Sequence, residues 1–255
     1  MATVAENGLA QDPSRSGDYL SYTRVAIILH WAIAGLIIFN LVSGLLIWDF
    51  AKDFFKSHHA FYVFGITSHL SSGMTVLALT VARILWRLMH EPPAYPASMK
   101  PWERHSAHFV HFLLYAGMLL MPLTGWAILS AHPPAGSAGA LAAPPPMPAG
   151  PPNAAAGPPP SGPPAGPRRA PPPPGIWWVA PLPMITPITD LGREPGGVKP
   201  QHVLHEQLAD WHKTGAYVML LLLFLHIGGA LKHQLVDEEP ELQRMGVGRG
   251  RSSVA

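Results

Sequence analysis

Four long apolar stretches constrain the fold of this chain more than any other feature of its sequence. Crossing the hydrocarbon core of a membrane takes about 20 mostly apolar residues in a helix, because every backbone N–H and C=O must find its partner within the segment. Each stretch is long enough to cross once, so the sequence predicts an all-α membrane protein, a bundle of four transmembrane helices. The stretches run from Val25 to Trp48, from Phe61 to Leu88, from Ala107 to Leu129 and from Leu208 to Leu235.

The overall composition agrees with a membrane class. Of the 255 residues, 48% are hydrophobic and only 13% are charged, which leaves too little polar surface for an ordinary soluble protein of this size. The chain has no cysteine, which excludes disulfides, thiolate metal ligands and iron–sulfur clusters. The net charge of +2 does not indicate a nucleic-acid partner, because basic residues beside membrane helices report orientation first.

The charge distribution and the spans divide the chain into six parts. The first residues are polar and lack an apolar stretch ending at a small-residue cleavage site, so we expect no cleaved signal peptide there. Basic residues favour, by a modest margin, placing both termini in the cytoplasm. The parts are a cytoplasmic N-terminal tail (1–22), transmembrane helices one to three (23–130), a Pro/Ala/Gly-rich periplasmic linker (131–175), a periplasmic loop (176–204), transmembrane helix four (205–236) and a cytoplasmic tail (237–255).

Proline dominates the segment between the third and fourth helices. Residues 133–174 contain 18 of the 30 prolines of the chain. Proline removes backbone donors and favours extended polyproline geometry, so we expect a semi-rigid, solvated linker that forms no packed element. The apolar, aromatic segment GIWWVAPLPMI that follows is expected to pack against the mouth of the bundle at the membrane surface.

Five of the fourteen histidines lie within or at the edge of the spans, where an ionisable side chain indicates a functional site. His212 and His226 are fourteen residues apart, which puts both on one helix face about 21 Å apart along the axis. The second helix repeats this spacing with His69 and Arg83. With helices that alternate in direction, His69 and His212 share the periplasmic depth. His30 in the first helix and His226 then share the cytoplasmic depth.

Two imidazoles at each depth are the ligands that a six-coordinate b-type haem needs. The sequence therefore predicts two haem b groups, and Arg83 could neutralise a haem propionate. Covalent c-type attachment is excluded because no CxxCH motif is present. Glycines beside the histidines suggest room for the macrocycle, namely Gly73, Gly215, Gly228 and Gly229.

Spacing leaves two alternatives open. His111, with His108 one turn earlier, also lies at the cytoplasmic depth, so either His30 or His111 could face His226. His205 lies two turns before His212 on the same face and is its rival. We favour a role beside the haem or at a quinone site for His111 and His108.

The helices resemble those of the bacterial cytochrome b561 family, four-helix di-haem proteins of the inner membrane. The resemblance rests on YTRVAIILHW, HLSSGMTVLALTVARILWRL, AHFVHFLLYAGMLLMPLTGW and WHKTGAYVMLLLLFLHIGGALKH, which cover all four helices in order. It implies that His30, His69, His212 and His226 are the axial ligands, and so favours His30 over His111 and His212 over His205. The proline-rich insertion departs from the family.

The resemblance also implies a function. Members are similar to quinone-linked electron carriers, and one bacterial type oxidises superoxide and passes the electron to ubiquinone. We therefore expect single electrons to pass from a periplasmic donor, superoxide or a redox partner protein, to the quinone pool of the inner membrane. Lys213 and Lys56 are candidates for steering an anionic donor. The alternatives are a cytochrome subunit of a separate dehydrogenase or hydrogenase, and a histidine-rich transporter of a metal or of haem.

Overall fold

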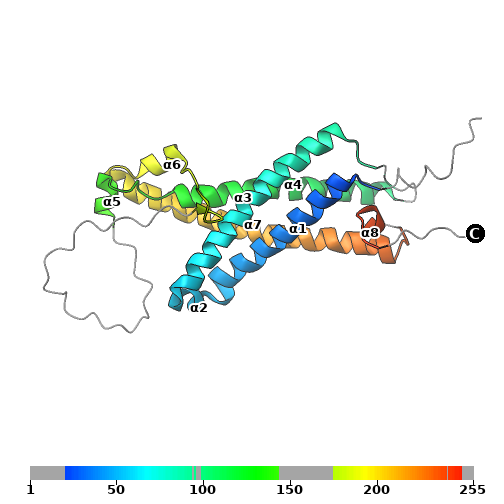
Figure 1. Ribbon diagram of the computed structural model, residues 1–255, viewed down its shortest axis with the longest axis horizontal. Helices are drawn as coiled ribbons and strands as arrows, with labels where there is room; N and C mark the ends of the chain where they lie inside the picture. The colour runs from blue at the N-terminus through cyan, green and yellow to red at the C-terminus, as the bar shows by residue number, and fades with distance from the viewer. Residues whose placement is uncertain (1–20, 94, 96–98, 144–174, 240, 249–255) are drawn as a thin grey trace, which may run out of the picture.

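The computed structural model describes residues 21–93, 95, 99–143, 175–239 and 241–248, and it confirms four helices long and apolar enough to cross a membrane. These four helices are α1, α3, α4 and α7 (Figure 1). The elements in chain order are α1 (Arg24–Leu45), the π-helical turn η3 (Leu46–Phe50), α2 (Lys52–Ser57), α3 (His59–Met89), α4 (Pro101–Ser130), α5 (Ala138–Ala142), β1 (Gly175–Ile176), β2 (Ala180–Pro181), α6 (Thr186–Leu191), α7 (Pro195–Leu235) and α8 (Glu241–Arg244).

The four long helices pack as two hairpins. Helix α1 packs against α3 and α4 packs against α7, while α3 and α4 join the two hairpins (Figure 1). Most large apolar side chains point outward, as lipid-facing residues do, and the small buried core lies in the middle of the bundle. The core consists of Ile33, Val76, Leu114, Met118, Met219 and Leu222.

Both ends of the described chain lie at the same end of the bundle. The backbone N–H of Tyr22 donates to the carbonyl of Arg244 over 3.2 Å, and the indole N–H of Trp31 donates to the carbonyl of Met245 over 2.9 Å. The segment after α7 therefore folds back onto the start of α1, as an even number of crossings requires.

Two of the helices begin earlier than hydropathy predicts. Helix α4 starts at Pro101, where the Glu103 carboxylate accepts the Lys100 backbone N–H over 3.0 Å and so satisfies a donor at the helix start. Helix α7 starts at Pro195, so residues 195–204 are helical and not the loop that we expected. The buried amide of Gln201 donates to the carbonyls of Ile188 and Thr189 over 2.8 and 3.1 Å, which fixes this first part of α7 against α6.

The linker expected over 131–175 is wrong at its beginning. Residues 138–142 form the short helix α5, which packs on α7 through a hydrogen bond of 2.7 Å from the Gly139 N–H to the Arg193 carbonyl. A Cβ at Gly139 would lie 1.8 Å from the Gly192 carbonyl oxygen, so this close packing depends on glycine. The remaining proline-rich residues, 144–174, lie outside the described residues.

The segment expected at the mouth of the bundle forms a small antiparallel hairpin, β1–β2, in which Gly175 pairs with Pro181 and Ile176 with Ala180. It packs against α3. The backbone N–H of Trp177 donates to Ser71 Oγ over 2.8 Å, and its indole N–H donates to Thr75 Oγ1 over 3.0 Å. Because Ser71 follows His69 by two residues, the hairpin lies beside one of the candidate ligands.

Candidate functional site

The structure brings His69 of α3 and His212 of α7 together at one end of the bundle. Their ring centres are 6.2 Å apart and their planes are inclined by 70°. His205, the rival of His212, instead contacts His132 at 4.9 Å, and its Nδ1 faces the carbonyl of Ile128. We call the first arrangement the His69–His212 level.

A hydroxyl group lies within hydrogen-bond distance of Nδ1 of each imidazole at this level. Ser43 Oγ of α1 lies 3.1 Å from Nδ1 of His69, and Thr124 Oγ1 of α4 lies 2.9 Å from Nδ1 of His212. Neither residue was predicted from the sequence to take part in the site. Both contacts therefore engage the Nδ1 edges of the two rings.

The structure brings His30 of α1 and His226 of α7 together towards the other end. Their ring centres are 6.1 Å apart with planes inclined by 65°. Arg83 of α3 lies beside this pair, with its Nη1 3.0 Å from Nδ1 of His30. His111 of α4 also contacts His226, at 5.0 Å between ring centres. This second arrangement is the His30–His226 level, and about 21 Å of α7 separates it from the first.

Two arginines place positive charge at the second level. The guanidinium of Arg83 lies 5.8 Å from the ring centre of Tyr115, and that of Arg87, one turn further along α3, lies 5.9 Å from the same ring. Both distances are typical of cation–π contacts. Arg83 was predicted from the sequence to lie at this site, but Arg87 was not, because its proximity depends on how α3 packs on α4.

The spacing of the rings tests whether each pair could hold one metal ion between them. An imidazole nitrogen lies about 2.0 Å from a metal ion that it binds, and the ring centre lies about 1.15 Å beyond that nitrogen. Two imidazoles on opposite sides of one ion therefore have ring centres about 6.3 Å apart. The spacings of 6.2 Å for His69 and His212 and 6.1 Å for His30 and His226 fit this value. The 5.0 Å between His111 and His226 is too short for it.

Two glycines that were not predicted lie against the rings, while the expected open space is found at Gly228 and Gly229 but not at Gly215. A Cβ at Gly44 would lie 3.2 Å from Cε1 of His69, and a Cβ at Gly125 would lie 3.3 Å from Cε1 of His212. Of the glycines that sequence analysis named, Gly215 packs against Met121, and a Cβ at Gly228 would meet no atom within 4 Å. A Cβ at Gly229 would likewise meet no atom within 4 Å, and a Cβ at Gly73 would meet only Oδ1 of Asn40, at 3.8 Å.

Lys213, which was expected to steer an anionic donor, forms an ion pair with Asp49. Its Nζ lies 2.6 Å from Oδ1 of Asp49 in η3, and the Tyr217 hydroxyl donates to Oδ2 of the same carboxylate over 3.0 Å. The positive charge of Lys213 is therefore partly offset. The side chain of Lys56 lies outside the described residues.

An ion-pair cluster closes the end of the bundle nearest the His30–His226 level. Lys232 pairs with the buried carboxylate of Glu103 and with Asp237, and His233 contacts Asp237 at 2.6 Å. The Lys232 ammonium holds the pKa of Asp237 below its usual range, so this carboxylate stays charged in mildly acidic solution. The cluster fixes the end of α7 to the start of α4.

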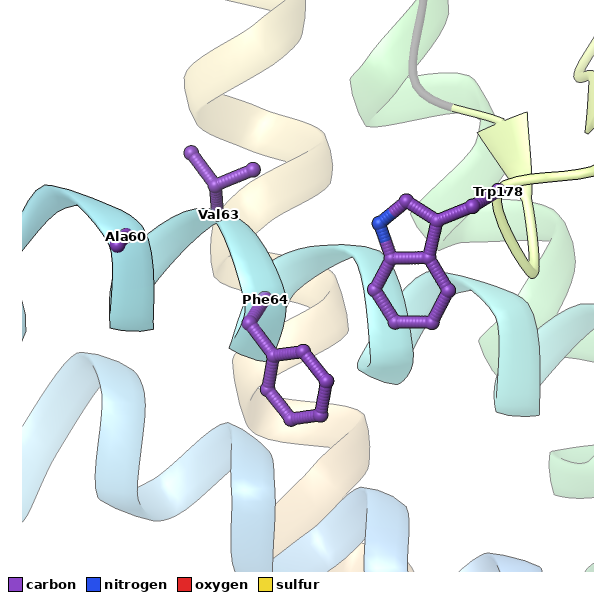
Figure 2. Close-up of a pocket in the computed structure, with 4 residues that line it drawn as sticks. All are labelled: Ala60, Val63, Phe64 and Trp178. Atoms are coloured by element: carbon purple, nitrogen blue, oxygen red, sulfur yellow. The ribbon is translucent and has the colours of Figure 1, made fainter.

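Beside the His69–His212 level, an apolar groove of about 580 Å³ opens on the outer side of α3. It is lined by Ala60, Val63, Phe64 and Trp178, and Figure 2 shows the Trp178 indole reaching from the β1–β2 hairpin toward Phe64. These two rings are stacked, with centres 5.5 Å apart and planes inclined by 20°. The groove has the apolar, aromatic character of a lipid-facing surface.

Comparison with known proteins gives two findings. A family model described as prokaryotic cytochrome b561 matches residues 21–248, which include all four long helices. A cytochrome b562 from Cereibacter sphaeroides is 36% identical over 104 residues, which are 41% of this chain and 63% of that protein. The chain thus spans somewhat less than two thirds of the length of this relative.

Proposed function

Since the chain belongs to the prokaryotic cytochrome b561 family, we propose that it is a di-haem cytochrome carrying single electrons between a donor and the quinone pool. The family makes the chain a multi-pass membrane protein that binds b-type haem and acts in electron transfer with redox partners. The number of haems, the residues that hold them, the donor and the acceptor are our proposals.

The spacing of the two histidine pairs carries this proposal. His69 and His212 would hold one haem and His30 and His226 the other, since both ring spacings are close to the value for opposite ligands of one ion. When bound, haem b supplies a one-electron ferric/ferrous couple. Arg83 and Arg87 place positive charge beside the second pair, where it would offset the propionates.

For the donor we propose superoxide, and for the acceptor ubiquinone. Two superoxide ions lose one electron each and become dioxygen, and one quinone takes up these two electrons with two protons and becomes quinol. We place the His69–His212 level on the periplasmic side of the inner membrane and both termini in the cytoplasm. The sidedness of the basic residues supports this orientation.

Optical spectroscopy of the purified full chain tests the cofactor part of the proposal. We expect a reducible b-type haem spectrum with about two haems per chain. A preparation from haem-sufficient cells that binds only one haem, or none, would refute the di-haem assignment.

Single-turnover oxidation tests the donor. The oxidised protein in liposomes that contain ubiquinone is mixed with superoxide, and the reduction of the haem is followed. We expect haem reduction followed by quinol formation, both abolished by superoxide dismutase. Reduction by quinol alone, with none by superoxide, would instead favour a cytochrome subunit that serves a separate dehydrogenase.

A further inference from the structure

The two helical hairpins repeat one arrangement around the His69–His212 level. In the first hairpin, Ser43 of α1 contacts His69 of α3. In the second, Thr124 of α4 contacts His212 of α7 in the same way, through Nδ1 and at nearly the same distance. Each hydroxyl residue is followed directly by a glycine.

The acceptors around the two imidazoles determine which ring nitrogen carries hydrogen. Ser43 Oγ donates its hydrogen to the Asn40 carbonyl over 3.2 Å, and Thr124 Oγ1 donates to the Met121 carbonyl over 2.9 Å. The Asn40 carbonyl also accepts from the imidazole of His69, and the Met121 carbonyl also accepts from that of His212. A carbonyl has no hydrogen to donate, so the hydrogen of each contact comes from the ring. Nδ1 of both rings must therefore carry the hydrogen, which leaves the lone pair on Nε2.

The glycines let the rings approach the neighbouring helix. A Cβ at Gly44 or at Gly125 would come within 3.2 or 3.3 Å of the Cε1 atom next to Nδ1. This is tighter than ordinary van der Waals contact, so a larger residue would push the ring away from its hydroxyl partner. The Ser-Gly and Thr-Gly pairs thus act as two copies of one unit. In each copy the hydroxyl forms a hydrogen bond with the ring, and the glycine leaves space for the ring to come close.

The spacing of the other candidate residues shows that the repeat extends over both hairpins. His30 precedes Ser43 by thirteen residues, and His111 precedes Thr124 by thirteen. Fourteen residues separate His69 from Arg83, and fourteen separate His212 from His226. The histidine, hydroxyl and glycine positions thus correspond between the hairpins, except that Arg83 in the first hairpin corresponds to His226 in the second.

We propose that Ser43 and Thr124 are positioning residues that fix the tautomer of both axial ligands at the His69–His212 level and thereby set the reduction potential of the haem held there. This rests on the proposed function, which assigns a haem to this level. A hydrogen bond from Nδ1–H makes a ligating imidazole a stronger electron donor, which stabilises the ferric state. Removing the hydroxyl leaves only the backbone carbonyl of Asn40 or Met121 to accept from the ring, which weakens this effect and therefore raises the potential of this haem alone.

The test is a redox titration of the purified full-length holoprotein, in which the haem of the His30–His226 level serves as an internal reference. We expect Ser43→Ala and Thr124→Ala to shift the ferric/ferrous ratio of one and the same haem by up to about tenfold, or about 59 mV for one electron. Thr124→Ser keeps the hydroxyl and restores the wild-type potential. Ser72→Ala is the matched control, because the buried Ser72 hydroxyl donates only to backbone carbonyls at the same level.

Loss of that one haem in the alanine variants, with rescue in Thr124→Ser, supports the proposal equally. It is overturned if neither alanine variant moves a potential, if both haems shift together, or if Ser72→Ala has the same effect. A wild-type protein that binds no haem at this level would refute the proposed function and this proposal with it, whereas unchanged potentials in variants that hold both haems would refute only the positioning roles.

Discussion

The His69–His212 level and the His30–His226 level lie in the same four helices but differ in what surrounds their imidazoles. At the first level both rings have neutral hydroxyl partners in matching positions, Ser43 and Thr124. At the second level the partner of His30 is the guanidinium of Arg83. The first level is symmetric between the two hairpins, whereas the second is not.

This difference has a chemical consequence for His30. A guanidinium has donors and no acceptor, so Nδ1 of His30 accepts from Arg83 and the ring carries its hydrogen on Nε2. Coordination through Nε2 therefore requires Arg83 to release the ring. A haem propionate is the kind of anion that a guanidinium would bind instead. The two levels therefore differ in the groups that contact Nδ1, which are hydroxyls at the first level and a guanidinium at the second.

The largest expected effect is the loss of a whole haem. We predict that His212→Ala and His226→Ala each lower the haem content from about two per chain to about one, because each removes one of two axial ligands. The two variants should retain different haems, which differ in potential and in spectrum. His202→Ala is the control, since His202 is an exposed residue of α7 whose nearest charged partner is Glu206. Two haems in either ligand variant would contradict the assignment of that histidine.

The second prediction concerns the cation of the asymmetric level. Arg83→Leu should lower the potential of the His30–His226 haem, because a nearby positive charge favours the ferrous state, which carries one positive charge less than the ferric state. A tenfold change in the ferric/ferrous ratio corresponds to about 59 mV, and we expect a shift of about this size. The measurement is a redox titration, with Arg104→Leu as the control. Arg104 is an exposed cation at the same end that lies over Tyr95. An unchanged potential would show that Arg83 does not act on this haem.

The sequence was sufficient to predict the four helices and two depths with histidines, and the family resemblance chose His30 and His212, which the structure places beside His226 and His69. Hydropathy located the spans because a membrane demands long apolar helices, and the fourteen-residue spacing of His212 and His226 located two depths. The starts of α4 and α7 were missed because Pro101 and Pro195 begin polar turns that extend beyond the apolar stretch. Hydropathy carries no signal for such extensions.

The hydroxyl and glycine partners were not predicted, although a signal for them exists. Ser43 and Thr124 contact histidines on other helices, so their role depends on which helix faces meet, and one helix alone does not reveal this. The shared thirteen-residue distance from His30 to Ser43 and from His111 to Thr124 could have indicated the repeat. The pairing of Lys213 with Asp49 was missed for the same reason, because η3 and α7 are far apart in the sequence.

The third prediction concerns the approach to the symmetric level. Because Asp49 offsets the charge of Lys213, Lys213→Gln should slow the reduction of the protein by superoxide only about threefold at low ionic strength. Asp49→Asn should speed it up by a similar factor, and both effects should vanish in high salt. Stopped-flow rates measure this, with Lys199→Gln as an exposed control on α7. If Lys213→Gln and Asp49→Asn were reduced at the same rate, Lys213 would have no part in attracting the donor.

The smallest expected effect is that of replacing His111, the rival of His30 as the partner of His226. His111 corresponds to His30 in the repeat, yet its ring centre lies only 5.0 Å from that of His226, too close for an opposite ligand of the same ion. We therefore predict that His111→Ala retains both haems in the six-coordinate state, whereas His30→Ala loses the haem of this level or leaves it five-coordinate. Optical and electron paramagnetic resonance spectra measure the two outcomes side by side. If His111→Ala lost the haem and His30→Ala kept it, the equivalent positions on α1 and α4 would exchange roles, and the ligands of the second level would both come from the α4–α7 hairpin.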